Sequence, residues 1–172
     1  MPMIRLARPS DLASLADIER SAAQRFLDTH MAWAAGDGTV PPAELAQAQA
    51  AGLLWVAEGG DGQVAGFALT RPMDGDLYLA EMAVTLQSQG RGLGRALLQA
   101  VCTHARDAGC YRSVVLTTDR VLPWNRPFYQ RLGFTEVPQT SLSPGLEARL
   151  RYEEAAGFDP AQRCAMAYLL ER

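Results

Sequence analysis

Three glycines at alternate positions, Gly90, Gly92 and Gly94, form the segment of this sequence best suited to bind an anion. They follow an apolar stretch, Leu77–Val84, that predicts a strand, and they precede residues with the apolar spacing of a helix. The first backbone N–H groups of a helix have no partner within it, and the helix dipole favours negative charge there. Glycines also let the backbone approach a ligand closely. The spacing therefore predicts a binding site for a phosphate or pyrophosphate group.

Two common phosphate-binding motifs can be compared with this loop. A dinucleotide-binding fingerprint has the spacing G-x-G-x-x-G and an acidic residue about 20 positions further on. The spacing here is G-x-G-x-G, and neither Asp107 nor Asp119 is well placed for a ribose. A P-loop requires a lysine, and this sequence contains none, because all 16 of its Lys+Arg residues are arginine. The P-loop is excluded, and the dinucleotide fingerprint does not match.

A third pattern fits the loop. Gln89, Gly92 and Gly94 match the Q/R-x-x-G-x-G/A signature of the GNAT family of N-acetyltransferases. The segment Trp124–Phe134 (WNRPFYQRLGF) resembles a second landmark of that family, a tyrosine on a short helix followed by Gly-Phe. The residues AEMAV before the loop resemble the family's central bulged strand. The chain therefore resembles a GNAT N-acetyltransferase over roughly residues 3 to 170.

The predicted elements indicate an α+β fold around a mixed sheet. Strands are predicted at 3–7, 53–58, 63–71, 77–84, 112–118, 134–137 and 163–170, and helices at 11–25, 43–51, 91–108, 127–132 and 145–156. Ser10 is the expected N-cap of the first helix, and Gly66 within a strand predicts a bulge or a close contact.

A helical crossover joins the strands predicted at 77–84 and 112–118, so these two strands should run parallel. The helix between them is predicted to pack one apolar face, formed by Leu93, Leu97, Val101 and Ala105. The resemblance implies a GNAT-type, mostly antiparallel central sheet flanked by helices, in which a splayed parallel strand pair forms the acyl-CoA cleft.

The resemblance further implies acetyl-CoA as the co-substrate, bound without a metal. The backbone of Met82, Ala83 and Val84 would hydrogen-bond the acetyl carbonyl and the pantetheine arm. The residues that would bind the cofactor around its pyrophosphate are Gln89, Gly90, Arg91, Gly92, Leu93, Gly94 and Arg95. Asn125 would either touch the cofactor arm or cap the helix that begins at Pro127.

Two residues are candidates for proton transfer. Tyr129 matches the general acid of the family, since a phenol with a pKa of about 10 can return a proton to a thiolate whose thiol has a pKa of about 8.5. The alternative is a core tyrosine packed beside Phe128 and Phe134. Glu81 is the one carboxylate in the strand predicted at 77–84. It could act as the general base, contact the substrate, or serve a structural role.

The resemblance places the acceptor pocket in the irregular N-terminal stretch, where the candidate substrate contacts are Phe26, Asp28, His30 and Trp33. The interpretation is an N-acetyltransferase that moves an acetyl group from acetyl-CoA to an amine, on a small molecule or a peptide N-terminus, by direct attack in a ternary complex. Two alternatives use the same fold. One is transfer to a hydroxyl or of a longer acyl chain, and the other is a non-catalytic acyl-CoA-binding or sensing module.

Composition narrows the class of protein further. The 172 residues are 48% hydrophobic and 20% charged, which predicts one GNAT-like domain over residues 1–172. The net charge of −3 argues against nucleic acid or an acidic membrane as a partner. Three cysteines without metal-ligand spacing, two histidines and no apparent signal peptide or membrane-spanning run predict a cytoplasmic protein with reduced thiols and no metal site. The resemblance also allows a homodimer formed at a sheet edge.

Overall fold

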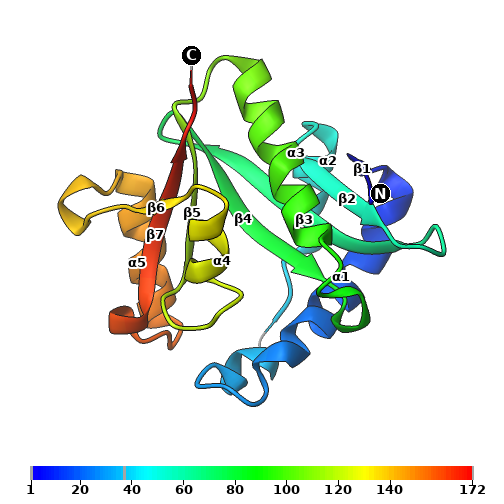
Figure 1. Cartoon of the computed structure of the whole chain (residues 1–172), viewed down its shortest axis with the longest axis horizontal. Helices are drawn as coiled ribbons and strands as arrows, with labels where there is room; N and C mark the ends of the chain where they lie inside the picture. Colours follow the sequence, from blue (N-terminus) through cyan, green and yellow to red (C-terminus); the bar gives the residue numbers. More distant parts are fainter. Residues whose placement is uncertain (1, 37, 172) are drawn as a thin grey trace. The chain divides into compact units, whose positions relative to one another are not determined.

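The structure is a computed structural model, and it describes residues 2–36 and 38–171. Seven strands form one mixed sheet in the order β1-β2-β3-β4-β5-β7-β6 (Figure 1). Their bounds are β1 Met3–Leu6, β2 Leu54–Glu58, β3 Val64–Met73, β4 Asp76–Val84, β5 Ser113–Asp119, β6 Thr135–Glu136 and β7 Arg163–Leu169. The sheet is mostly antiparallel, and β4 and β5 are its parallel pair. The predicted fold class and the parallel pair are therefore confirmed.

Five α-helices accompany the strands in the described part of the chain: α1 Leu12–Ala23, α2 Pro42–Ala50, α3 Leu93–Ala108, α4 Arg126–Arg131 and α5 Pro144–Ala155. The apolar face predicted for α3 is buried along its whole length, as Leu93, Leu97, Val101 and Ala105 are all at most 6% exposed. The chain divides into two compact units, Met1–Arg71 with Ala80–Val101, and Pro72–Leu79 with Cys102–Arg172.

In the first unit, helices α1 and α2 pack their apolar sides on the strands. Leu15 and Ile18 face inward from α1, and Leu45 and Ala48 do so from α2, as the helical spacing of these residues requires. Strands β2 and β3 and the end of β4 supply most of the rest of this core. Its strand residues are Leu54, Val56, Phe67, Leu69 and Ala83.

The first helix begins differently from the prediction that Ser10 caps it. Residues Pro9–Asp11 form a 3-10 turn, Ser10 is exposed, and α1 starts at Leu12 without a side-chain cap. The carboxylate of Asp11 instead accepts a hydrogen bond from the Arg8 N–H (2.7 Å) and pairs with Arg5 at 2.8 Å. The Arg5 guanidinium holds the pKa of this carboxyl below its usual range. Ser10 lies within the 3-10 turn, and the residue that precedes α1 is Asp11, whose carboxylate is bound to Arg5 and Arg8 instead of to the first amides of the helix.

The hairpin between β2 and β3 contains both features that Gly66 suggested. Ala57 pairs with Gly66 while Glu58 pairs with Val64, so β3 carries one extra residue at this point. A Cβ on Gly66 would lie 2.9 Å from the Ala83 carbonyl oxygen and 3.2 Å from Cγ2 of Val84. The glycine therefore permits the close approach of β3 to the end of β4.

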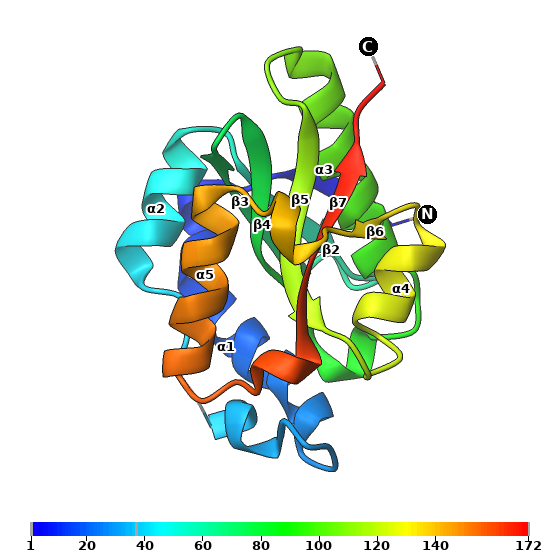
Figure 2. The ribbon, with the colours of Figure 1, turned by 90° about the vertical axis from the view of Figure 1, so that its left-hand side faces the viewer.

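The second unit is built on β5 and β7, which pair over their full lengths beside the two-residue strand β6. Leu77 and Tyr78 at the start of β4 pair in parallel with Val114 and Val115. Helix α5 packs on β5 and β7 (Figure 2). It is held there by the buried carboxylate of Glu153, which accepts a hydrogen bond from Thr117 on β5 (2.7 Å) and pairs with Arg163 on β7 (3.1 Å).

We expect Gly66→Ala to destabilise the protein by about 1–3 kcal/mol, because the added methyl overpacks the contact with β4. The matched control is Gly60→Ala in the same hairpin, where a Cβ meets nothing within 4 Å. The control should change the free energy of unfolding by less than about 1 kcal/mol. Urea denaturation followed by circular dichroism measures both, and equal stabilities of the two variants would contradict the close contact.

Candidate active site

The glycine-rich loop leads from β4 directly into α3. After the 3-10 turn Leu86–Ser88, Gly90 and Gly92 adopt φ values of 78° and 83°. This left-handed backbone favours glycine, although a Cβ at either position would meet no atom within 4 Å. The Ala96 N–H donates to the Gly92 carbonyl (3.0 Å), which makes this bond the first of the helix. The N–H groups of residues 93–95 therefore have no acceptor within the helix, which is the arrangement that binds anions.

The entrance to this loop is fixed by three hydrogen bonds. The Thr85 N–H donates to the Ala65 carbonyl on β3 (2.8 Å), and the Leu86 N–H donates to the hydroxyl of Ser21 on α1 (2.9 Å). The side chain of Gln89 turns back, and its Nε2 donates to the carbonyl of Val84 (2.9 Å). The Gln89 side-chain amide thus closes the turn, which leaves the backbone of the loop as the part that can face a ligand.

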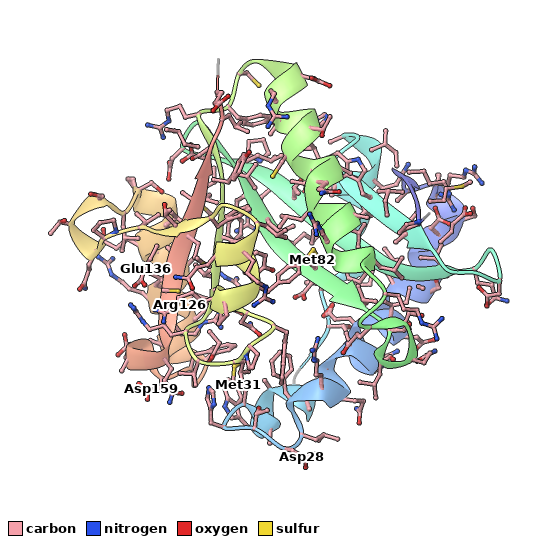
Figure 3. All side chains as sticks on the ribbon, in the orientation of Figure 1. Asp28, Met31, Met82, Arg126, Glu136 and Asp159 are labelled. Atoms are coloured by element: carbon pink, nitrogen blue, oxygen red, sulfur yellow. The ribbon has the colours of Figure 1, made fainter. Side chains whose placement is uncertain are left out.

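The end of β4 carries the residues predicted to face the acyl group. Ala83 is buried, while Glu81, Met82 and Val84 are half-buried. Successive side chains of a strand point to opposite faces, so Glu81 shares a face with Ala83, and Met82, labelled in Figure 3, shares the other with Val84. The one carboxylate in this part of the strand is therefore partly shielded from water.

Tyr129 lies on the six-residue helix α4 and is half-buried. Its ring packs edge-on against Phe128 and Phe134, with centroid distances of 5.2 and 5.7 Å. After α4 ends at Arg131, Leu132 and Gly133 reverse the chain, and Gly133 has a φ of 95°. A Cβ there would lie 3.0 Å from the ring of Tyr168, so this glycine also lets the ring of Tyr168 approach the backbone.

Asn125 precedes α4 but does not cap it. Although it occupies the N-cap position, its side chain makes no capping hydrogen bond, and Nδ2 donates to the hydroxyl of Thr118 on β5 (2.9 Å). The capping alternative is therefore wrong, because the threonine hydroxyl takes the amide away from the helix. Oδ1 of Asn125 is buried and accepts no hydrogen bond from the described residues. A buried acceptor of this kind is commonly satisfied by a ligand or a water molecule.

The four candidate acceptor contacts fall in one segment of the first unit. Phe26 ends a 3-10 turn, and Trp33 lies in a second one, Ala32–Gly36. Between them, Asp28 and His30 are exposed, and Figure 3 labels Asp28 together with Met31. Met31 is buried and anchors the segment. The segment thus combines an exposed aromatic ring, 43% exposed at Trp33, with an acidic group.

Comparison with known proteins identifies the family. The model of the Acetyltransferase (GNAT) family matches residues 14–134. The chain belongs to the GNAT family. N-acetyltransferase 8F1 of Rattus norvegicus is 35% identical to it over 97 residues, which is 54% of this chain and 43% of the relative. The chain thus spans about two fifths of the length of the curated rat relatives that it matches.

Solved structures support the GNAT fold. The ribosomal-protein-S18-alanine N-acetyltransferase of Escherichia coli aligns over 100% of this chain and 96% of its own, with a TM-score of 0.68 and 20% identity. A GNAT family acetyltransferase of Brucella melitensis, solved in complex with acetyl-CoA, is 26% identical over 78% of this chain and 83% of its own, with a TM-score of 0.57.

Two of the three cysteines of this GNAT chain, Cys102 and Cys164, are poorly suited to form an acyl-enzyme. Burial raises the pKa of both Cys102 and Cys164 to about 11, while Cys110 is exposed. A thiol that relays an acyl group must ionise near neutral pH. Among the described residues, no group of three or more His, Cys, Asp and Glu side chains is arranged to hold a metal ion. None of the helices in that part of the chain has the length and apolar character needed to span a bilayer.

Two polar contacts beside the GNAT landmarks do not follow from the sequence pattern. One is the Ser21 hydroxyl that accepts from Leu86. The other is the carboxylate of Glu136 on β6, which pairs with Arg126, the first residue of α4. In the sequence, Glu136 could have been noticed only as an acidic residue in the short strand predicted at 134–137. The signal for Ser21 was its place on the predicted first helix, but its partner is 65 residues away.

We expect iodoacetamide at pH 8 to alkylate Cys110 at least about tenfold faster than Cys102 or Cys164, because the two half- or fully buried thiols stay protonated. Mass spectrometry of peptides over time gives the three rates. In urea the three rates should converge. Alkylation of Cys164 in the folded protein as fast as that of Cys110 would contradict the burial described above.

Proposed function

We propose that this chain is a single domain over residues 1–172 that acts as an acyl-CoA-dependent N-acetyltransferase, moving an acetyl group from acetyl-CoA to an amine by direct attack in a ternary complex. The observation that carries the proposal is the loop in which two left-handed glycines lead straight into the N-terminus of α3. Membership of the GNAT family and the acetyl-CoA complex of the Brucella relative support it. Transfer to a hydroxyl and a non-catalytic acyl-CoA sensor are the alternatives that the experiments below test.

The loop binds the pyrophosphate of coenzyme A through the backbone N–H groups of residues 90–95. Arg91 and Arg95 are exposed and add positive charge. The backbone of residues 82–84 binds the pantetheine arm and the acetyl carbonyl. Attack by an amine on a thioester develops negative charge on that carbonyl oxygen, and a fixed N–H donor directed at it lowers the barrier. The open Oδ1 of Asn125 supports a role in accepting a hydrogen bond from the cofactor arm.

Tyr129 donates the proton that the departing thiolate of coenzyme A requires. Its phenol is the group of the second landmark that can do so, and the two phenylalanine rings hold it in one orientation. Glu81 either accepts the proton that the amine must lose, directly or through water, or orients the substrate ammonium. The half-buried setting of its carboxylate supports both roles and is also compatible with a purely structural one.

The acceptor amine, on a small molecule or a peptide N-terminus, contacts Phe26, Asp28, His30 and Trp33. The exposed acidic and aromatic side chains in this segment support a cationic acceptor with an apolar part. The three unpaired cysteines support a reducing compartment such as the cytoplasm. A homodimer formed at a sheet edge remains part of the proposal, to be tested by sedimentation.

Gly92→Glu should abolish binding of acetyl-CoA. The substitution puts a carboxylate beside the diphosphate and forces a non-glycine residue into a left-handed backbone, which together should cost more than about a hundredfold in affinity. Titration calorimetry measures the affinity. Gly60→Glu, on the exposed β2–β3 hairpin, is the control and should bind like the wild type. Unchanged affinity of the Gly92 variant would refute the phosphate site.

Tyr129→Phe should lower kcat by roughly 10²- to 10⁴-fold, the usual contribution of a positioned acid, and leave the affinity for acetyl-CoA within about twofold. Release of coenzyme A with a panel of polyamines, amino acids, aminoglycosides and peptides measures turnover. Tyr152→Phe, exposed on α5, is the matched control. An unchanged kcat would remove Tyr129 as the acid, and tight binding by the wild type without turnover across the panel would favour the sensor.

A further inference from the structure

Glu136 binds two arginines from opposite ends of one loop. Its Oε2 pairs with Nη1 of Arg126 at 3.2 Å, and its Oε1 pairs with Nη1 of Arg120. Arg120 directly follows β5 and Arg126 opens α4, so the carboxylate links the two ends of the loop 120–125. Figure 3 shows Glu136 and Arg126 beside each other. All three side chains are about one third exposed.

The β5 side of this loop is fixed independently of Glu136. The Arg120 N–H donates to the Gln162 carbonyl (2.7 Å), and its Nε donates to the Arg163 carbonyl (3.2 Å). Oδ1 of Asp119 accepts from the N–H groups of Val121 and Leu122, at 2.8 and 2.9 Å. At the other end, Asn125 is held by its N–H to the Leu122 carbonyl (3.0 Å) and by its Nδ2 to Thr118 (2.9 Å). Removal of the Glu136 charge would therefore leave the loop in place and release chiefly the side chain of Arg126, at the start of α4.

The helix that begins at Arg126 is too short to hold its own direction. It has six residues, and helices of this length depend on contacts with the rest of the protein. Its second half is held by the packing of Tyr129 against Phe134. Its first residue is held by Glu136. Tyr129 is three residues further on, and its N–H donates to the Asn125 carbonyl (3.1 Å), so a shift of the helix start moves the tyrosine as well.

The two ion pairs of Glu136 should affect the orientation of α4 more than the stability of the fold. Partly exposed ion pairs contribute little to stability. In catalysis, however, a misplacement of a reacting group by about 1 Å can cost about a hundredfold in rate. Loss of the carboxylate should thus be visible in the rate before it is visible in the unfolding temperature.

We propose that Glu136 is a positioning residue for the acyl transfer, which sets the direction of α4 and thereby the location of the Tyr129 phenol. The inference rests on the proposed function, in which Tyr129 is the proton donor. Glu136 acts through Arg126 and does not touch the reacting atoms.

The test is Glu136→Gln, which keeps the shape of the side chain and removes its charge. We expect kcat to fall about 10- to 100-fold, with the affinity for acetyl-CoA within about twofold. The matched control is Glu147→Gln, which breaks an exposed ion pair with Arg151 on α5 and should leave kcat unchanged. In Glu136→Asp, the side chain is too short to reach both arginines, so its kcat should lie between those of the wild type and the glutamine variant.

A double-mutant cycle separates positioning from a general structural effect. In a Tyr129→Phe background, Glu136→Gln should lower kcat less than twofold further, because the group that it positions is gone. The proposal would be overturned if Glu136→Gln lowered kcat by the same factor in both backgrounds, or did not lower kcat in the wild-type background. An unchanged kcat for Tyr129→Phe alone would instead refute the proton donor of the proposed function.

Hydrogen exchange provides a readout that needs no turnover. In the absence of any ligand, the hydrogen-bonded amides of residues 129–131 should exchange at least about fivefold faster in Glu136→Gln than in the wild type, while those of β5 should not change. Equal exchange at α4 in the two proteins would overturn the proposal even if no acceptor were found.

Discussion

The constraint on which the candidate site depends is the path of the backbone between β4 and α3. Between the 3-10 turn that follows β4 and the start of α3, the chain passes through two left-handed residues, Gly90 and Gly92. Most other residues would resist that conformation, while the space around both positions is open. The result is a helix whose first amides are uncovered. The fixed turn before the loop, with its hydrogen bonds to α1, β3 and β4, keeps those amides in one place.

A second constraint is the close contact between β3 and the end of β4. The close approach of β3 to the Ala83 carbonyl requires a residue without a Cβ, and Gly66 provides it. The extra residue in β3 lies next to this contact. Such a bulge bends a strand and increases its local twist, so the end of β4 is shaped by its neighbour as well as by its own sequence.

Much of this arrangement could be predicted from the sequence because it depends on local rules. The buried face of α3, the parallel β4–β5 pair and the loop before α3 follow from spacing and crossover handedness. The prediction for Ser10 failed because Ser10 lies within the 3-10 turn Pro9–Asp11, and α1 starts after Asp11. The prediction of a cap at Asn125 failed because Thr118 takes its amide. The contacts of Glu136 could not be predicted, because they depend on the pairing of β6 with β7, about 30 residues apart in sequence.

The ion pairs described above share one chemical property. Every cation in them is a guanidinium, which stays protonated in proteins and therefore offers no free electron pair for attack on a thioester. A lysine in the same positions would lose its charge on acylation. In the proposed function, the acetyl donor would therefore leave the charges of these ion pairs intact.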